Sequence, residues 1–336
     1  MAALSSKKCC CDRRAATEGR PYNNALMTTT FEVRVPASTS NLGPGFDCFG
    51  LALKLYLTVR ATAVPDAAEP CRVVNTGAKE NEALPRNAAN LIYRAMAFAA
   101  RREGLTLPPV DLRVHNEIPL ASGLGSSAAA IVAGIKLGSL ITGLEISDQS
   151  ILNYTTEFEG HPDNVAASIY GGFLASCTCH DAAVVSAKFV WPEEVRVVVV
   201  SPHSQLPTHV ARAALPRTVS RHDAVHNLQR SALFVSAIAQ QRYDILWEAM
   251  RDRLHQPQRE SLVPGLREAL AIPRMPGLLG IALSGAGPSI VALVNDNDDE
   301  IGARVASCFE AHGIEATTRI LEVDNEGCRV NSSSSV

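Results

Sequence analysis

The sequence predicts an α+β protein of two domains. Its 336 residues exceed the length of one typical domain, which is about 150 residues. Hydrophobic residues make up 46% of the chain and charged residues 19%, as in globular proteins with a large buried core. Strand patterns occur partly in runs with helical patterns between them, rather than in the strict alternation of a doubly wound parallel sheet.

The first half of the chain is expected to begin with a strand, because Phe31–Val35 alternates apolar and polar side chains. Two more strands are expected at 51–63 and at 110–118, the latter because residues 111–118 alternate in the same way. Apolar residues at helical spacing predict helices near 88–103, 126–141, 147–159 and 163–170.

The second half is expected to begin at the apolar strand Val195–Val200. The preceding segment Trp191–Glu194 is the expected joint between the two domains. Further apolar runs predict strands at 280–284 and 289–294. Helical spacing predicts helices near 222–239, 243–250, 259–270 and 299–312.

Both ends of the chain are expected to be disordered. Residues 1–28 are polar, and the strand pattern starts only at Phe31, so they form a disordered leader or precede a true start near Met27. The tail 324–336 ends in the low-complexity segment Asn331–Val336.

Composition excludes several classes of protein. The net charge of −3 argues against nucleic acid or an anionic membrane as the main partner. No apolar run approaches about 18 residues, and the leader lacks the apolar core of a secretory signal. The nine cysteines have no disulfide-framework spacing, which favours reduced thiols in a cytoplasmic protein. Cys177–His180 has no second ligand pair and is not expected to bind a metal.

A glycine-rich loop follows the strand that ends at residue 118. Gly123 and Gly125 permit backbone conformations that a side chain would forbid, and Ser126 and Ser127 then begin a helix. The free N–H groups and positive dipole of a helix N-terminus favour phosphate binding. The loop is therefore a candidate phosphate site, and a tight helix-packing turn is the alternative.

Two better-known phosphate motifs do not fit. The P-loop pattern of glycine, four residues and Gly-Lys-Ser/Thr is absent. The spacing Gly123-x-Gly125-x-x-Ala128, with Glu145 beyond it, matches a dinucleotide-binding fingerprint. That fingerprint needs a strand directly before the glycines and a second parallel strand after the helix. Neither is expected here.

Three segments in order resemble the motifs of the GHMP kinases, a superfamily of small-molecule kinases. They are Pro36–Gly50, Pro119–Ile131 and Leu283–Ile290. The resemblance implies a ribosomal protein S5 domain 2-like, ATP-binding amino-terminal domain over 29–193. It also implies a ferredoxin-like carboxy-terminal domain over 194–323.

Within this superfamily the chain is most similar to the homoserine kinases. The resemblance implies ATP-dependent phosphorylation of the L-homoserine hydroxyl to O-phospho-L-homoserine, a step toward threonine, with Mg²⁺ as cofactor. It implies no nucleic-acid or membrane partner and is compatible with a homodimer. A mevalonate-type GHMP kinase and a catalytically silent ligand-binding relative are the alternatives. The segments that carry this resemblance are Asn41–Asp47, Glu159–Val165, Ala211–Pro216 and Leu254–Gly265.

The resemblance implies a substrate site built from both halves of the chain. Guanidinium forks match carboxylates in geometry, so Arg212 and Arg259 are expected to bind the substrate carboxylate. Asp47 is suited to the ammonium group. The expected substrate-binding residues are Asn41, Asp47, His161, Arg212 and Arg259.

The resemblance also implies a metal and nucleotide site. Ser127 and Glu159 are expected to hold Mg²⁺; Glu157 is the alternative, but it points about 200° away on a helix. Asn164 stands in place of a carboxylate base, which favours direct attack by the substrate hydroxyl, with Asp163 as the alternative base. The expected ATP-binding residues are Asn90 near adenine, and Pro119, Leu120, Ala121, Ser122, Gly123, Leu124, Gly125, Ser126, Ser127, Ala128 and Ala129.

Overall fold

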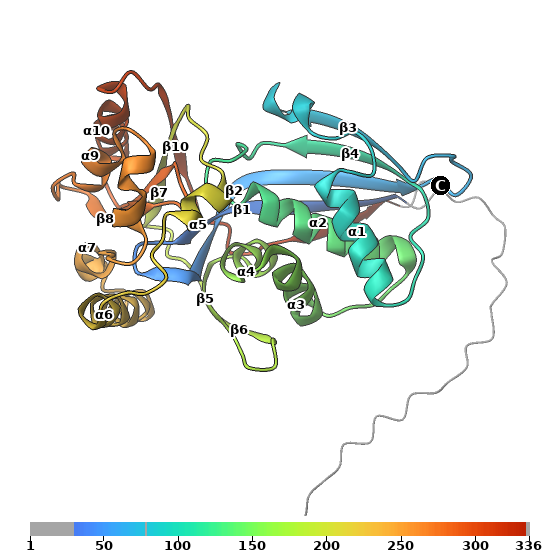
Figure 1. The fold of residues 1–336 in the computed structure, drawn as a ribbon, viewed down its shortest axis with the longest axis horizontal. Coiled ribbons are helices and arrows are strands. Elements are labelled where there is room, and N and C mark those ends of the chain that lie inside the picture. The colour runs from blue at the N-terminus through green and yellow to red at the C-terminus, as the bar shows by residue number, and fades with distance from the viewer. Residues whose placement is uncertain (1–29, 78, 334–336) are drawn as a thin grey trace, which may run out of the picture.

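The computed structural model describes residues 30–77 and 79–333, which form two β-sheets with helices packed against them (Figure 1). The larger sheet has seven strands and the smaller has four. The expected leader, residues 1–28, lies outside the described residues. The predicted α+β class is confirmed, since strands and helices are not in strict alternation.

The seven-stranded sheet runs in the order β11-β1-β2-β4-β3, and β5 pairs with both β2 and β6. All neighbours are antiparallel except β3 and β4. The strands are β1 (Thr30–Asn41), β2 (Gly45–Ala63), β3 (Cys71–Gly77), β4 (Val110–Asn116), β5 (Phe173–Thr178), β6 (Val184–Phe189) and β11 (Arg329–Ser333).

Four helices lie on one side of this sheet (Figure 1). They are α1 (Leu91–Arg102), α2 (Ser126–Thr142), α3 (Asp148–Glu159) and α4 (Asp163–Tyr170), and the 3₁₀ turn η1 (Lys79–Ala83) follows β3. Helices α2 and α4 contact β1 and β2, and α1 and α3 contact α2. The start of α2 is therefore held over the sheet by buried packing on several sides.

The four-stranded sheet is antiparallel and runs in the order β10-β7-β9-β8. Numbered along the chain, its strands follow the order 4-1-3-2 with helices after the first and third, the ferredoxin-like arrangement that was expected. Helix α10 packs on β7 and β10. The elements are β7 (Arg196–Pro202), β8 (Leu278–Leu283), β9 (Ile290–Val294), α10 (Asp298–Glu310) and β10 (Ala316–Leu321).

The segment between β7 and β8 carries short helices. The single helix expected at 259–270 is wrong: α8 ends at Arg259, and Pro264 and Gly265 interrupt the chain before α9. A proline disfavours helical geometry in the residue before it, and Val263 is extended, with φ −135° and ψ 120°. The elements are α5 (Thr208–Ala213), α6 (Arg221–Ala239), η2 (Tyr243–Ile245), α7 (Leu246–Ala249), α8 (Gln256–Arg259), η3 (Glu260–Leu262) and α9 (Leu266–Leu270).

The expectation of a disordered tail from residue 324 is wrong for residues 324–333. The Asp324 carboxylate is buried and accepts hydrogen bonds of 2.7 Å from the N–H groups of Glu326 and Gly327. Strand β11 then pairs with β1 along Thr30–Arg34 and covers its edge. The chain thus returns to the first sheet after β10, and the domain boundaries at 193 and 323 remain predictions.

Two expectations about the class of protein can be compared with the described residues. Within them, no helix combines the length and apolar character needed to cross a membrane. The six cysteines described there are free thiols.

Candidate functional site

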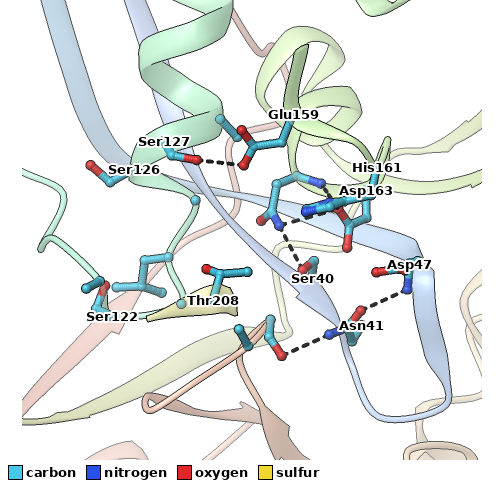
Figure 2. Close-up of a pocket in the computed structure, with 18 of the residues that line it drawn as sticks. Ser40, Asn41, Asp47, Ser122, Ser126, Ser127, Glu159, His161, Asp163 and Thr208 are labelled. Carbon is cyan, nitrogen blue, oxygen red and sulfur yellow. Dashed lines mark hydrogen bonds and ion pairs between the residues drawn. The ribbon is translucent and has the colours of Figure 1, made fainter. Parts of the chain in front are cut away.

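A pocket lies at the junction of the two sheets (Figure 2). Its walls come from the β1–β2 turn, the loop into α2, the α3–α4 loop, the helices α5 and α8, and the β8–β9 turn. All predicted site residues line it except Leu120, Ala129 and Asn90. The structure therefore brings together predicted residues that are as much as 218 positions apart in the chain, Asn41 and Arg259.

Five pocket residues were not predicted. Ser40 and Phe46 lie inside the first motif, and Gly285 and Ala286 lie inside the third, so the motifs indicated their segments but not their roles. Thr208, at the start of α5, carried no sequence signal.

The loop before α2 leaves the first N–H groups of the helix without helical partners. Gly125 caps α2 in the left-handed conformation, with φ 69° and ψ 24° and no side-chain cap. The first hydrogen bond of the helix runs from the N–H of Ala129 to the carbonyl of Gly125, at 2.9 Å. The N–H groups of Ser126, Ser127 and Ala128 precede that bond, next to the pocket, where the helix dipole favours an anion.

The third motif holds this loop in place. Ser284 Oγ donates a hydrogen bond of 2.7 Å to the carbonyl of Gly123. The N–H of Ser289 donates to the carbonyl of Ser122 at 3.2 Å, and the N–H of Gly285 donates to the carbonyl of Ser40 at 3.0 Å. The β8–β9 turn of the second sheet therefore fixes the shape of a loop that belongs to the first.

One wall of the pocket pairs a hydroxyl with a carboxylate. Ser127 Oγ donates to Glu159 Oε1 at 2.6 Å (Figure 2). The alternative carboxylate, Glu157, forms an ion pair with Arg102 on α1 and does not line the pocket. A hydroxyl and a carboxylate oxygen are ligands that Mg²⁺ accepts, so this pair fits the expected metal.

Asn164 is held by two serines of β1. Its Oδ1 accepts a hydrogen bond of 3.0 Å from Ser38 Oγ, and its Nδ2 donates to Ser40 Oγ at 2.9 Å. Both ends of the amide are therefore oriented before any ligand binds.

The neighbouring Asp163 and His161 form a close pair. His161 Nδ1 lies 2.6 Å from Asp163 Oδ1, which also accepts from the N–H of Asn164 at 2.7 Å. Burial raises the pKa of Asp163, but the hydrogen bonds and charge of His161 and the N–H of Asn164 outweigh it, so the pKa is lowered. Burial lowers the pKa of His161, but Asp163 outweighs that effect and the pKa is raised.

Replacing Asp163 with asparagine is expected to lower the pKa of His161 to below the ordinary histidine value of about 6.5. The variant removes the charge that raises this pKa, while burial, which lowers it, remains. An NMR titration of the His161 imidazole in wild type and variant measures the change. An unchanged or higher pKa in the variant would contradict this account of the pair.

The same shifts give the pair a pH window for stability. The His161 contribution is complete below its unfolded pKa of about 6.5 and is lost as pH rises through the raised folded value. The Asp163 contribution is complete above about 3.9 and is lost as pH falls through the lowered folded value. The pair therefore stabilises the folded protein most between these two values.

Another wall of the pocket, the charged wall, is formed by Asp47, Arg212 and Arg259, and the first two of these are in contact. Arg212 binds Asp47 through both terminal nitrogens of its guanidinium: Nη2 lies 2.7 Å from Oδ1, and Nη1 lies 3.1 Å from Oδ2. Both side chains are about one-third exposed. Asn41 supports this turn, since its Oδ1 accepts from the N–H of Asp47 at 3.0 Å and its Nδ2 donates to Gly285 O at 2.9 Å.

Arg259 differs from Arg212 because it is almost fully buried. Its Nε donates to the carbonyl of Ala211 at 3.2 Å, and its Nη1 donates to the carbonyl of Gly285 at 3.1 Å. Burial and the charge of Arg212 lower the pKa of Arg259 to about 10, so the guanidinium remains charged at neutral pH. The pocket therefore holds the cations Arg212 and Arg259, and within the described part of the chain Arg259 has no carboxylate in contact.

The remaining predicted residues lie beside the pocket. Leu120 and Asn90 line an adjoining, mostly apolar pocket that shares Ser126 and Ser127 with the first. Asn90 caps α1: its Oδ1 accepts from the N–H of Ile92 at 3.0 Å, and its Nδ2 donates to Pro85 O at 2.8 Å. The amide oxygen and one of the two amide hydrogens of Asn90 are thus already used. Ala129 is buried in α2 and contributes to packing.

Comparison with protein families gives two matches along the chain. Residues 90–172 match the family described as GHMP kinases N terminal domain, and residues 234–311 match GHMP kinases C terminal. The first match includes the loop into α2 and the α3–α4 loop, and the second includes Arg259 and the β8–β9 turn.

Curated relatives match most of the chain. A homoserine kinase of Desulfitobacterium hafniense is 40% identical over 299 residues, which are 89% of this chain and 99% of that protein. A homoserine kinase of Deinococcus radiodurans is 46% identical over 261 residues, 78% of this chain and 83% of the relative.

Solved structures share the fold. A homoserine kinase of Cytophaga hutchinsonii superposes with a TM-score of 0.79 at 25% identity, covering 93% of this chain and all of the other. A mevalonate kinase of L. major, crystallised with R-mevalonate, gives a TM-score of 0.62 at 16% identity, covering 87% and 94%. The second likeness concerns the fold alone.

Proposed function

The chain belongs to the homoserine kinases, within the GHMP kinase family, and we propose that it transfers the γ-phosphoryl group of ATP to the hydroxyl of L-homoserine. The products are ADP and O-phospho-L-homoserine. The observation that carries the proposal is the single pocket in which an anion-binding helix N-terminus faces a bidentate arginine–aspartate pair.

The nucleotide is proposed to bind across both pockets. Its phosphates lie at the N–H groups of residues 126–128, because these groups are free and the helix dipole favours an anion. Its base lies in the adjoining pocket, whose wall includes Leu57, Ile92 and Leu120. Asn90 is proposed to act there by capping α1 rather than by contacting the base directly.

The amino acid is proposed to bind at the charged wall. L-Homoserine carries a carboxylate and an ammonium group, the same two charges that Asp47 and Arg212 present to each other. The ligand can therefore take over both partners, with its ammonium at Asp47 and its carboxylate at Arg212 and Arg259. His161 and Asn164 then lie near its terminal hydroxyl, on the side of the phosphate loop.

Mg²⁺ is proposed to be held by Ser127 and Glu159, and when bound it neutralises phosphate charge. The protein's own contribution is position: Asn164 is fixed by two serines, and the phosphate loop is fixed by the third motif. Asp163 is a poor base because its pKa is lowered and its Oδ1 already accepts two hydrogen bonds. We therefore favour direct attack by the substrate hydroxyl.

Release of ADP, measured with a panel of acceptors, tests the function. L-Homoserine should support turnover well above the rate with no acceptor, and mevalonate and other hydroxy amino acids should support little. Preference for mevalonate would favour the mevalonate-type alternative. No turnover with any acceptor would favour the silent ligand-binding alternative.

Replacing Ser127 with alanine is expected to raise the Mg²⁺ concentration for half-maximal rate about tenfold and to lower kcat, because the site loses one oxygen ligand. A Mg²⁺ titration at saturating ATP measures the shift. Ser126→Ala is the matched control, because the hydroxyl that contacts Glu159 is that of Ser127. An unchanged titration in Ser127→Ala, or an equal shift in the control, would contradict the assignment.

A further inference from the structure

His255 connects two parts of the charged wall without lining the pocket itself. Its imidazole is fully buried, and its Nε2 lies 2.8 Å from the carbonyl oxygen of Gly43 in the β1–β2 turn. Its Nδ1 lies 3.0 Å from Nη1 of Arg259. The ring also stacks on Phe46, with the centroids 5.3 Å apart. One side chain therefore joins the turn that carries Asp47 to the buried guanidinium.

These two contacts determine the protonation state of the ring. The carbonyl of Gly43 can only accept a hydrogen bond, so Nε2 must carry a hydrogen. The guanidinium of Arg259 can only donate, so Nδ1 must present its lone pair. The imidazole is therefore neutral in this arrangement.

The charges around the ring act in both directions. Burial lowers the pKa of His255, the charge of Asp252 raises it, and the charge of Arg259 lowers it again, so the net shift is downward. Asp47 is the other acidic group that acts on the ring, and it also raises the pKa of His255. The neutral form that the contacts require is thus also the form that the surroundings favour at neutral pH.

We propose that His255 is a positioning residue for the amino-acid substrate, because its neutral imidazole holds the Arg259 guanidinium against the pocket. Nη1 of Arg259 is shared between His255 and the carbonyl of Gly285, and Nε is held by Ala211. Loss of the His255 acceptor frees Nη1 from one of its two fixed partners. The inference rests on the proposed function, since its measurable consequence is affinity for L-homoserine.

Protonation of the His255 imidazole should weaken the binding of L-homoserine, as loss of the acceptor for Arg259 should. A hydrogen on Nδ1 would face the N–H of Arg259, and a second positive charge would lie 3.0 Å from the guanidinium. The affinity for L-homoserine is therefore expected to fall only once the pH drops below the lowered pKa of His255, which lies under the ordinary histidine value of about 6.5.

Two substitutions separate the two contacts of the ring. In His255→Asn, the asparagine Oδ1 can lie where the ring Nδ1 lies, so the acceptor for Arg259 is kept. In His255→Gln, the glutamine Nε2 can lie where the ring Nε2 lies, so only the hydrogen bond to Gly43 is kept. His255→Gln is expected to raise the KM for L-homoserine about tenfold, with kcat and the KM for ATP within about twofold of wild type. His255→Asn is expected to raise the same KM less than about threefold.

The matched control is His222, an exposed histidine whose Nδ1 lies 3.0 Å from Nη1 of Arg253, outside the pocket. His222→Gln and His222→Asn should leave every kinetic constant unchanged. Thermal unfolding of all four variants separates a loss of affinity from a loss of stability.

Calorimetric titration of L-homoserine, from about pH 7.5 down to the lowest pH at which the protein stays folded, gives a second readout that does not depend on His255→Gln folding. The affinity should fall in wild type and fall less in His255→Asn. Equal KM changes in the two His255 variants would overturn the inference. A fall that persists unchanged in His255→Asn belongs to another group, such as His161, and would also overturn it.

Failure of the proposed function would look different. Wild-type protein would then neither bind nor phosphorylate L-homoserine at any pH. Failure of the inference alone would leave wild-type turnover intact and would show only in the comparison of the two substitutions.

Discussion

Replacing Arg212 with alanine is expected to raise the KM for L-homoserine about ten- to two-hundred-fold and to leave the KM for ATP nearly unchanged. The variant removes a bidentate, charge-assisted contact, and hydrogen bonds to charged groups are worth roughly 1.5–3 kcal/mol. Steady-state kinetics with each substrate varied in turn measure both constants. Arg212→Lys should recover only part of the loss, because an ammonium group cannot reproduce the guanidinium fork.

The structure shows why a control acceptor is needed for this variant. Arg212 is bound to Asp47 in the structure, so its removal also leaves that carboxylate without its partner. An amino alcohol with the same hydroxyl and ammonium groups but no carboxylate should be a poor acceptor for wild type. Arg212→Ala should lose nothing further on it. An equal loss on both acceptors would mean that Arg212 acts on phosphate or on folding.

Arg217 is the matched surface control, because it follows α5 and is exposed. Arg217→Ala should leave both KM values unchanged. Arg259 cannot replace Arg212 in this test, although the sequence indicated the same role for both. Its guanidinium is buried and bonded to two carbonyl groups, so Arg259→Ala would lower stability and affinity together.

The strands and helices with strong periodicity could be predicted from the sequence, including the edge strand β8. The edge strands β3, β6, β10 and β11 and the inner strand β5 were not predicted. Strand β11 reads as a serine-rich tail, but β1 offers it a free edge, and edge pairing depends on backbone groups rather than side chains. Strand β10 is another edge strand and buries little, with no fully buried side chain. Such strands carry no clear alternation for a sequence pattern to detect.

The candidate site was predictable as a set of segments but not as a set of contacts. The motifs indicated the phosphate loop and both arginines, yet nothing in the sequence shows that Ser38 bonds Asn164, which lies 126 positions away. Nor does it show that Ser284 holds Gly123, 161 positions away. These contacts depend on how two sheets meet, which is a property of the packed fold.

Gly125, at the start of α2, is a further position where the structure shows contacts that the sequence does not. From the sequence, a side chain at Gly125 is expected to block the approach of phosphate to the backbone. In the structure, a Cβ atom there would lie 2.2 Å from Ser38 Oγ and 3.2 Å from Asn164 Oδ1. The side chain would therefore first displace the residues that orient Asn164, and the loop would move with them.

Replacing Gly125 with alanine is accordingly expected to lower kcat/KM for ATP by about a hundred-fold or more, because loss of one preorganised donor alone has that order of effect. Gly143, at the other end of α2, is a close control. Its φ of 68° and ψ of 20° nearly equal those of Gly125, but a Cβ atom there would have no neighbour within 4 Å.

Gly143→Ala thus introduces the same left-handed strain, which costs about 1–2 kcal/mol, without the collision. It should lower the midpoint of thermal unfolding and leave turnover unchanged. The difference between the two variants isolates the contact with Ser38 and Asn164 from the strain of the backbone. If both variants lose turnover equally, backbone strain in α2 and not the geometry of the phosphate loop controls the activity.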